Sequence, residues 1–203
     1  MKTSLSAEVL RALRATLVIA VIGGLVYPLV MTGLAQGLFH DQANGGLITA
    51  GTRVVGARLI GQDFTSDRYF HGRPSATVDE NDPTKPKPYN AANSGGDNLA
   101  PSNQALIDAV RQRVEAVRKA NPTLTGDVPI DLVTTDFSGF DPDISPAAAL
   151  LQVDRVAKAR GLDAAKLRAL VEQHVDGRPL AILGAPHVNV LALNLALDAM
   201  PSS

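Results

Sequence analysis

The pattern of apolar and polar positions divides the chain into an apolar N-terminal segment and a longer part of mixed character. From Ala15 to His40 the sequence contains no Asp, Glu, Lys or Arg. As a helix, these 26 residues would extend about 39 Å, which exceeds the roughly 30 Å hydrocarbon core of a bilayer. The pattern predicts a transmembrane helix over residues 15–36, a short N-terminus of residues 1–14 and a domain of residues 37–203.

A cleaved signal peptide is the alternative interpretation of this segment, because basic residues precede the apolar run. The run is long for a signal peptide, and Leu34-Ala35-Gln36 is a weak cleavage site, so we interpret the segment as an uncleaved anchor. A lone proline is tolerated in such a helix. Small and aromatic residues in the span suit contact with a partner helix, although ordinary membrane-helix composition explains the glycines equally well. These partner-contact candidates are Gly23, Gly24, Tyr27, Pro28 and Gly33.

The charges beside the apolar run predict its orientation. Lys2, Arg11 and Arg14 precede the run with one acid, Glu8, whereas the next basic residue after it is Arg53. The positive-inside rule then leaves the N-terminus in the cytoplasm and exports residues 41–203 to the periplasm or the cell exterior. We therefore expect a single-pass protein of the cell (inner) membrane.

The first part of the exported region reads as strand and loop. Residues 53–60 form a β-like run that Gly61 closes, whereas residues 62–101 have little periodicity and many turn formers. Within that long loop, residues 79–88 carry the composition of a mobile segment. A second strand is predicted over residues 128–135, and a turn over residues 136–143 follows it.

Helix signals dominate the rest of the chain. Three helices are predicted with a polar cap at the start. The first begins at Ser102 and ends at Asn121, the second begins at Ser145 and ends at Gly161, and the third begins at Asp163 and ends near His174. Residues 189–199 alternate like a strand, but Leu and Ala propensity with Asn189 as a cap favours a last helix. The expected fold is a single α+β, or α/β, exported domain on one N-terminal transmembrane helix.

Composition excludes several classes of site. The whole chain has 19 basic and 20 acidic residues, and three of the basic residues and one acid precede residue 41. The exported part therefore has 16 basic and 19 acidic residues. This slightly acidic balance predicts no nucleic-acid partner. The chain has no cysteine, which excludes disulfides and thiolate chemistry. The four histidines (His40, His71, His174 and His187) lack metal-ligand spacing, Ser75 lacks a nucleophile elbow, and Asp141 and Asp143 lack the other ligands of a calcium loop. No catalytic residue and no metal site is predicted.

One short stretch is a weak nucleotide candidate. Ser94, Gly95 and Gly96 stand before a helix, an arrangement that can wrap an anion. The predicted orientation places them outside the cell, away from ATP, and Asp97 adds a negative charge beside any phosphate. We expect turn chemistry there rather than a phosphate site.

Eight segments stand out, in chain order: GLVYPLVMTGLAQ, QANGGLI, GARLIGQDF, YFHGRPSAT, PYNAANSGGDNLAPSN, DLVT, DPDISPAAALLQVDRVAKARGL and HVNVLALNLALD. Taken together they resemble the KdpC family, a family of subunits of the potassium-transporting P-type ATPase known as the Kdp complex. Asp97 departs from the family pattern, which often has Ser there. The resemblance implies that Tyr89, Asn90 and Asn98 are further candidates for partner contact.

The resemblance also implies a role in a complex. The partners would be the potassium channel-like KdpA, the ATPase KdpB and the very small KdpF, which handle potassium, ATP and Mg²⁺, so that this chain binds no cofactor directly. This chain would be a non-catalytic accessory subunit near the potassium entrance of KdpA. One alternative is a catalytic chaperone that raises the ATP affinity of KdpB in a ternary complex. The other is an anchored periplasmic hydrolase.

Overall fold

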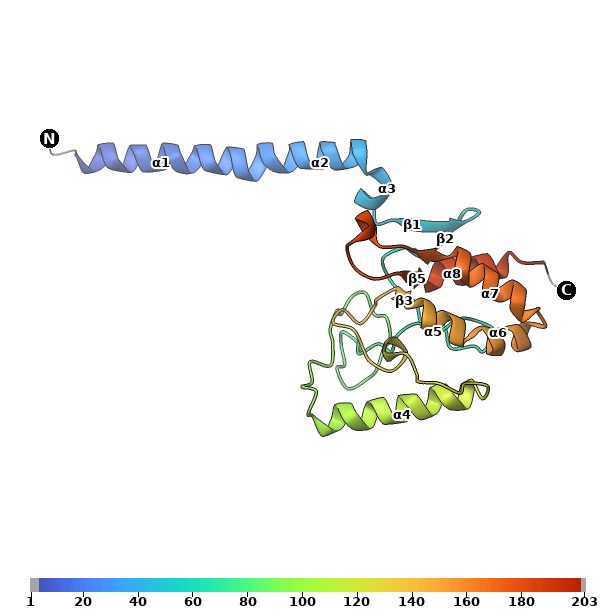
Figure 1. The fold of residues 1–203 in the computed structure, drawn as a ribbon. Helices are drawn as coiled ribbons and strands as arrows, with labels where there is room; N and C mark the ends of the chain where they lie inside the picture. The colour runs from blue at the N-terminus through green and yellow to red at the C-terminus, as the bar shows by residue number, and fades with distance from the viewer. Residues whose placement is uncertain (1–3, 202–203) are drawn as a thin grey trace. The chain divides into compact units, whose positions relative to one another are not determined.

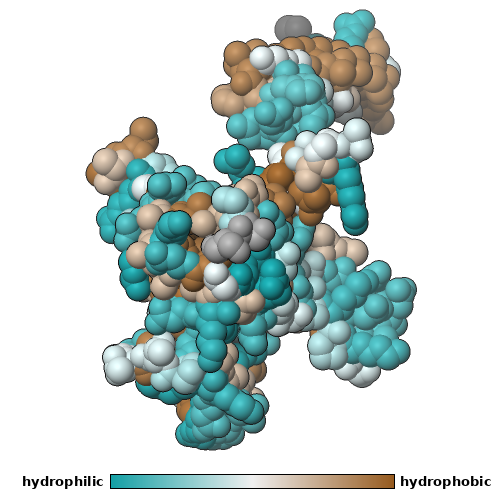
Figure 2. Space-filling view, turned by 90° about the vertical axis from the view of Figure 1, so that its right-hand side faces the viewer, coloured by the Kyte–Doolittle hydropathy of each residue, from teal (hydrophilic) through white to brown (hydrophobic). Residues whose placement is uncertain are grey.

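The computed structural model describes residues 4–201 and consists of two units, one extending to Leu47 and the other beginning at Ile48 (Figure 1). Lys2, which contributes to the predicted orientation, lies outside the described residues. Figure 2 shows apolar side chains over much of the long helix and mainly polar side chains over the domain.

A continuous helical run from Leu5 to Leu38 dominates the first unit and is long and apolar enough to cross a membrane. It comprises α1 (Leu5–Val21), a π-helical turn (Ile22–Val26) and α2 (Tyr27–Leu38). The wide turn has a local cause, because Pro28 has no N–H and its ring crowds the carbonyl four residues earlier. Instead, the N–H of Tyr27 bonds the carbonyl of Ile22, five residues back. The predicted span of residues 15–36 lies within this run.

A short helix, α3 (His40–Ala43), follows the long helix. The side-chain amides of Gln36 and Asn44 pair with each other at 3.0 and 3.3 Å, and Asn44 Nδ2 also donates to the carbonyl of His40 at 2.7 Å. These bonds hold the turn between α2 and the start of the domain.

The domain begins with a two-stranded sheet of β1 (Leu47–Ala50) and β2 (Arg53–Ala57). The strand predicted over residues 53–60 therefore ends earlier than expected. A tight turn, with an isolated bridge between Ala57 and Ile60, reverses the chain after β2. The sequence pattern did not indicate β1.

A three-stranded antiparallel sheet and four helices form the core, a mixed helix and sheet fold as predicted. The strand order is β3 (Asp143–Ile144), β5 (His187–Asn189) and β4 (Val175–Asp176). The helices are α5 (Pro146–Leu151), α6 (Val153–Arg160), α7 (Ala164–Gln173) and α8 (Val190–Asp198), and a 3-10 turn (Pro179–Ala181) lies between β4 and β5. The fully buried apolar side chains include Phe70, Val153, Leu167, Val188, Leu193 and Leu197.

Most predicted caps are confirmed. The side chains of Ser145, Asp163 and Asn189 each accept a bond from a first-turn N–H, and Gly161 ends α6 with φ of 69°. The helix predicted from Ser145 to Gly161 divides at Gln152. The expected last helix is α8, so helix rather than strand follows Asn189.

Two sequence predictions are wrong. The cap of α4 (Gln104–Ala120) is Asn103, not Ser102, because Asn103 Oδ1 accepts the N–H of Ala105 at 2.9 Å. The strand predicted over residues 128–135 is a 3-10 turn, Ile130–Leu132. There the carboxylate of Asp131 accepts bonds from the Ser145 N–H and hydroxyl, which turns the chain inward.

Residues 62–101, all of which the structure describes, contain no helix and no regular strand, only a bridge between Val78 and Pro86. The segment nevertheless contributes Phe70 to the core. The buried amide of Asn194 on α8 accepts the N–H of Phe70 and donates to its carbonyl, both at 2.9 Å. Residues 79–88, whose composition predicts a mobile segment, contain an ion pair of 2.7 Å between Lys87 and Glu80.

Candidate functional site

The Ser94-Gly95-Gly96 stretch packs against the turn at residues 135–139. The hydroxyl of Ser94 and the N–H of Gly95 both donate to the carbonyl of Ser138, at 3.1 and 3.0 Å. A β-carbon added to Gly96 would lie 2.9 Å from the carbonyl oxygen of Asp136. The glycine at this position thus permits two backbone segments to approach each other, and two donors of the stretch, the Ser94 hydroxyl and the Gly95 N–H, are used within the domain.

The carboxylate of Asp136 organises that turn. Oδ1 accepts the N–H groups of Ser138 and Gly139, both at 2.6 Å, and the hydroxyl of Ser138, while Oδ2 accepts the N–H of Asp141 at 3.4 Å. Burial alone would raise the pKa of the Asp136 carboxyl, but these hydrogen bonds outweigh it and lower the pKa below the usual value. The turn is therefore held by an ionised group at neutral pH.

Behind the turn, Ser75 connects it to the long loop. Its hydroxyl donates to the carbonyl of Gly139 and accepts the N–H of Tyr89 at 3.0 Å. Gly139 has φ of 79°, and a β-carbon there would collide with Thr77. These contacts make Ser75 a structural hydroxyl.

Two of the predicted partner-contact residues lie in this internal network. The hydroxyl of Tyr89 donates to the carbonyl of Arg73 at 2.7 Å, and burial raises the pKa of this phenol. Asn90 is buried and donates to the carbonyl of Val78 and to Glu80, both at 2.8 Å. Asn98, in contrast, is exposed and has φ of 50°.

The outer side of the turn presents an aromatic ring. Phe137 is 91% exposed, although the N–H of the next residue, Ser138, is hydrogen-bonded to the carboxylate of Asp136. It borders two surface hollows, of about 420 and 150 Å³, the first shared with Leu59 and the second with Leu99. The charged residues that line these hollows are Asp97, Asp136 and Asp141.

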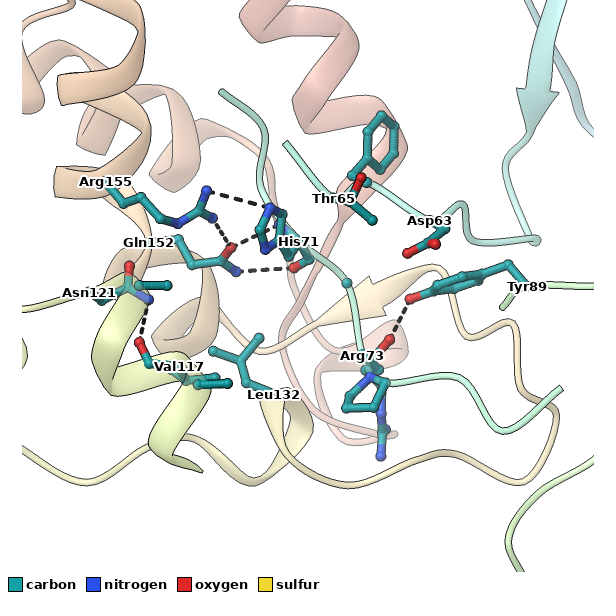
Figure 3. A pocket seen from close by; sticks show the side chains of 15 residues that line it. Asp63, Thr65, His71, Arg73, Tyr89, Val117, Asn121, Leu132, Gln152 and Arg155 are labelled. Carbon is teal, nitrogen blue, oxygen red and sulfur yellow. Dashed lines mark hydrogen bonds between the residues drawn. The ribbon is translucent and has the colours of Figure 1, made fainter. Parts of the chain in front are cut away.

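A separate cavity of about 400 Å³ lies between α4 and the start of α6 (Figure 3). Gln152 pairs with the main chain of His71, accepting its N–H at 2.8 Å and donating to its carbonyl at 3.0 Å. The buried guanidinium of Arg155 donates to Gln152 and to the carbonyls of Asp67 and Tyr69. These bonds tie residues 67–71 to α6. Within the described residues, Arg155 Nε and Asn121 Oδ1 have no hydrogen-bond partner.

The histidine rings bond mainly to the main chain. Burial, followed by the charge of Arg155, lowers the pKa of His71, whose Nε2 lies 3.0 Å from the carbonyl oxygen of Ser66. Over residues 4–201, the hydrogen bonds of the histidine rings go to main-chain carbonyls or to Asn and Arg side chains, and none reaches a hydroxyl. The same described residues contain no cluster of three potential metal ligands.

Comparison with known proteins assigns the family. The family model described as "K+-transporting ATPase, c chain", KdpC, matches residues 9–199. A protein of Rhodopseudomonas palustris named "Potassium-transporting ATPase KdpC subunit" is 56% identical over 196 residues, which is 95% of this chain and 98% of that protein. The chain belongs to the KdpC family.

Other KdpC relatives agree with this assignment. Proteins of the same name from Methylobacterium nodulans and Paraburkholderia phytofirmans are 57% and 51% identical over 199 and 183 residues. These alignments cover 94% and 90% of this chain, and 98% and 92% of the relatives.

The remaining KdpC candidate residues lie on the long helix. Gly23 and Gly24 fall in the π-helical turn, with Tyr27 and Pro28 directly after it and Gly33 further along α2. A β-carbon at any of these three glycines would meet nothing within 4 Å. Within the first unit the glycines are therefore not needed for internal packing.

The sequence predicts a turn at residues 136–143, but it does not indicate that this turn pairs with residues 94–96. The segment Asp136-Phe137-Ser138-Gly139 carries the signal of a turn in which an Asp side chain accepts main-chain N–H groups two and three residues later. The sequence also does not indicate the structural roles of Gln152, Asn194 and Arg155, because their hydrogen-bond partners are distant in sequence.

Proposed function

We propose that this chain is a non-catalytic accessory subunit of an ATP-driven potassium import pump. It stabilises the assembled complex and lies near the potassium entrance of the channel-like KdpA. Membership of the KdpC family supports a place in the pump, and the long apolar helix supports attachment to the membrane.

The observation that carries the accessory role is the internal use of the Ser94–Gly96 stretch. The hydroxyl of Ser94 and the N–H of Gly95 bond to Ser138, and Asp97 accepts the hydroxyl of Thr135 at 2.9 Å. A phosphate would have to compete with these bonds beside the carboxylates of Asp97 and Asp136. This favours an accessory subunit over a nucleotide-binding chaperone, and potassium, ATP and Mg²⁺ are assigned to KdpA and KdpB.

The arrangement of Ser75 also favours the accessory role over a hydrolase. Its hydroxyl is bonded to Gly139 and Tyr89, and it has no histidine at hydrogen-bond distance in the described part of the chain. A serine nucleophile needs an adjacent base to be activated.

Co-purification tests the proposal. Pump complexes are isolated in detergent from cells with and without this chain, and potassium-stimulated ATP hydrolysis is measured. When the chain is missing, we expect that the other subunits no longer co-purify as a complex and that potassium no longer stimulates ATP hydrolysis. A complex that assembles and transports potassium normally without it would refute the accessory role.

A photoreactive ATP analogue separates the two KdpC roles. We expect KdpB in the intact complex to be labelled and this chain to remain unlabelled. Labelling of this chain at residues 94–96 would establish the chaperone instead.

A further inference from the structure

We propose that Phe137 is the aromatic anchor through which the domain binds another component of the same ATPase, in an apolar recess bordered by Lys or Arg. This inference rests on the proposed accessory role and adds the contact surface. We call the surface formed by Leu59, Leu99 and Phe137 the Phe137 ridge.

The exposed apolar area of the ridge needs an explanation. Phe137, Leu59 and Leu99 are 91%, 69% and 38% exposed. Phe137 borders both hollows, while Leu59 lines one and Leu99 lines the other. Apolar and aromatic residues of this kind form the cores of protein interfaces, where rings enter recesses in the partner.

Hydrogen bonds and close contacts within the domain hold the backbone at the base of the ring. The carboxylate of Asp136, directly before Phe137, accepts the N–H groups of Ser138 and Gly139, directly after it. From the other side, a β-carbon at Gly96 would lie 3.1 Å from the α-carbon of Phe137, so the 94–97 loop supports the backbone of the ridge directly. A preorganised anchor loses little conformational entropy on binding, which raises its affinity.

The charges around the ring favour a partner surface with basic residues. Every charged residue lining the two hollows is an acid: Asp97, Asp136 and Asp141. Only Asp141 has a close cation among the described residues, Arg73 at 3.1 Å. Asp97 and Asp136 therefore leave negative charge beside the ring, which a basic rim on the partner would complement.

The same charges disfavour other occupants. An anionic lipid surface would be repelled by the carboxylates. A second copy of this chain, related by a two-fold axis, would bring the same acids against each other. A pump component with Lys or Arg around an apolar recess has neither problem.

Photocrosslinking from position 137 in the intact complex tests the inference. Phe137→p-benzoylphenylalanine replaces one exposed ring with a reactive one, and the matched control is Ile182→p-benzoylphenylalanine, because Ile182 is 75% exposed at a different site. We expect an adduct between position 137 and another protein of the pump, at a yield at least about fivefold above the control. Adducts with lipid or with a second copy, or a yield equal to the control, would overturn the proposal.

Charge variants provide a second readout. Asp97→Lys should weaken association with the purified partner proteins by about tenfold and reduce its salt dependence, whereas Asp127→Lys, at an exposed turn, should not. Equal effects of the two variants would contradict the basic recess. If the wild-type chain fails to co-purify with the pump at all, the accessory role itself fails. If it co-purifies but position 137 forms no specific adduct, only this inference fails.

Discussion

Gly96 and Asp136 approach each other so closely that a β-carbon at position 96 would lie 2.9 Å from the carbonyl oxygen of Asp136. At Gly95, next to it, an added β-carbon would meet nothing within 4 Å. The two glycines therefore have different roles. Gly96 is required for packing, whereas Gly95 is not.

Alanine substitution separates these roles. We expect Gly96→Ala to reduce the free energy of unfolding by about 1–3 kcal/mol, because two backbone segments must move apart. Gly95→Ala should change it by less than about 0.5 kcal/mol. Thermal unfolding of the full-length protein in detergent measures both. Equal destabilisation by the two variants would contradict the packing explanation.

The ionised carboxylate of Asp136 should make the free energy of unfolding depend on pH. Asp136→Asn should lower the free energy of unfolding at pH 7 by about 1–2 kcal/mol, because it removes an ionised acceptor of several hydrogen bonds. The folded-state pKa of Asp136 is lowered. The stabilisation that Asp136 provides is therefore fully present above its unfolded-state pKa, about 3.9, and is lost as the pH falls through its lower folded-state pKa.

Chemical denaturation at a series of pH values checks this sign. The difference between wild type and Asp136→Asn should stay constant from about pH 7 to pH 5 and shrink below about pH 4. A difference that grows on acidification would contradict the account.

Asn194 clamps the long loop to α8. Asn194→Ala should cost about 2–4 kcal/mol of unfolding free energy, because it leaves the N–H and carbonyl of the buried Phe70 without partners. The control is Gln104→Ala, whose exposed side chain bonds only Asp108. Denaturant titration of both variants provides the comparison, and similar midpoints would show that the clamp is not needed.

The glycines of the long helix give a prediction about assembly. Gly24→Leu should reduce the amount of partner proteins that co-purify, because a bulky side chain prevents close approach of another helix. Gly37→Leu is the matched control, since Gly37 is equally unhindered within its own unit. Unchanged co-purification for both variants would show that this face contacts no partner.

The sequence predicted the elements whose signals are local. Ser145, Asp163, Asn189 and Gly161 lie at helix ends as expected, because capping depends on residues within one turn. The strand predicted over residues 128–135 failed for the opposite reason. Asp131 bonds Ser145, fourteen residues later, and this tertiary contact overrides the β propensity of the segment.

The candidate site was predictable only in part. The Ser94–Gly96 stretch was expected to form a turn, whereas the structure has the turn just before it, at residues 91–92, and pairs the stretch with residues 135–139, about forty residues away. Periodicity does not encode such a pairing. The exposed ring of Phe137 was not predicted either, because a single aromatic residue in a turn reads the same whether it is buried or exposed.

The proposed accessory role near the potassium entrance requires the domain to lie outside the cell, away from ATP. The chain has no cysteine, so Gly95→Cys and Asp127→Cys each introduce a unique thiol, in the nucleotide candidate and at an exposed turn. Labelling with a membrane-impermeant maleimide in intact cells, compared with lysed cells, measures the side directly. The account predicts labelling of both variants in intact cells. Labelling of either variant only after lysis would contradict it.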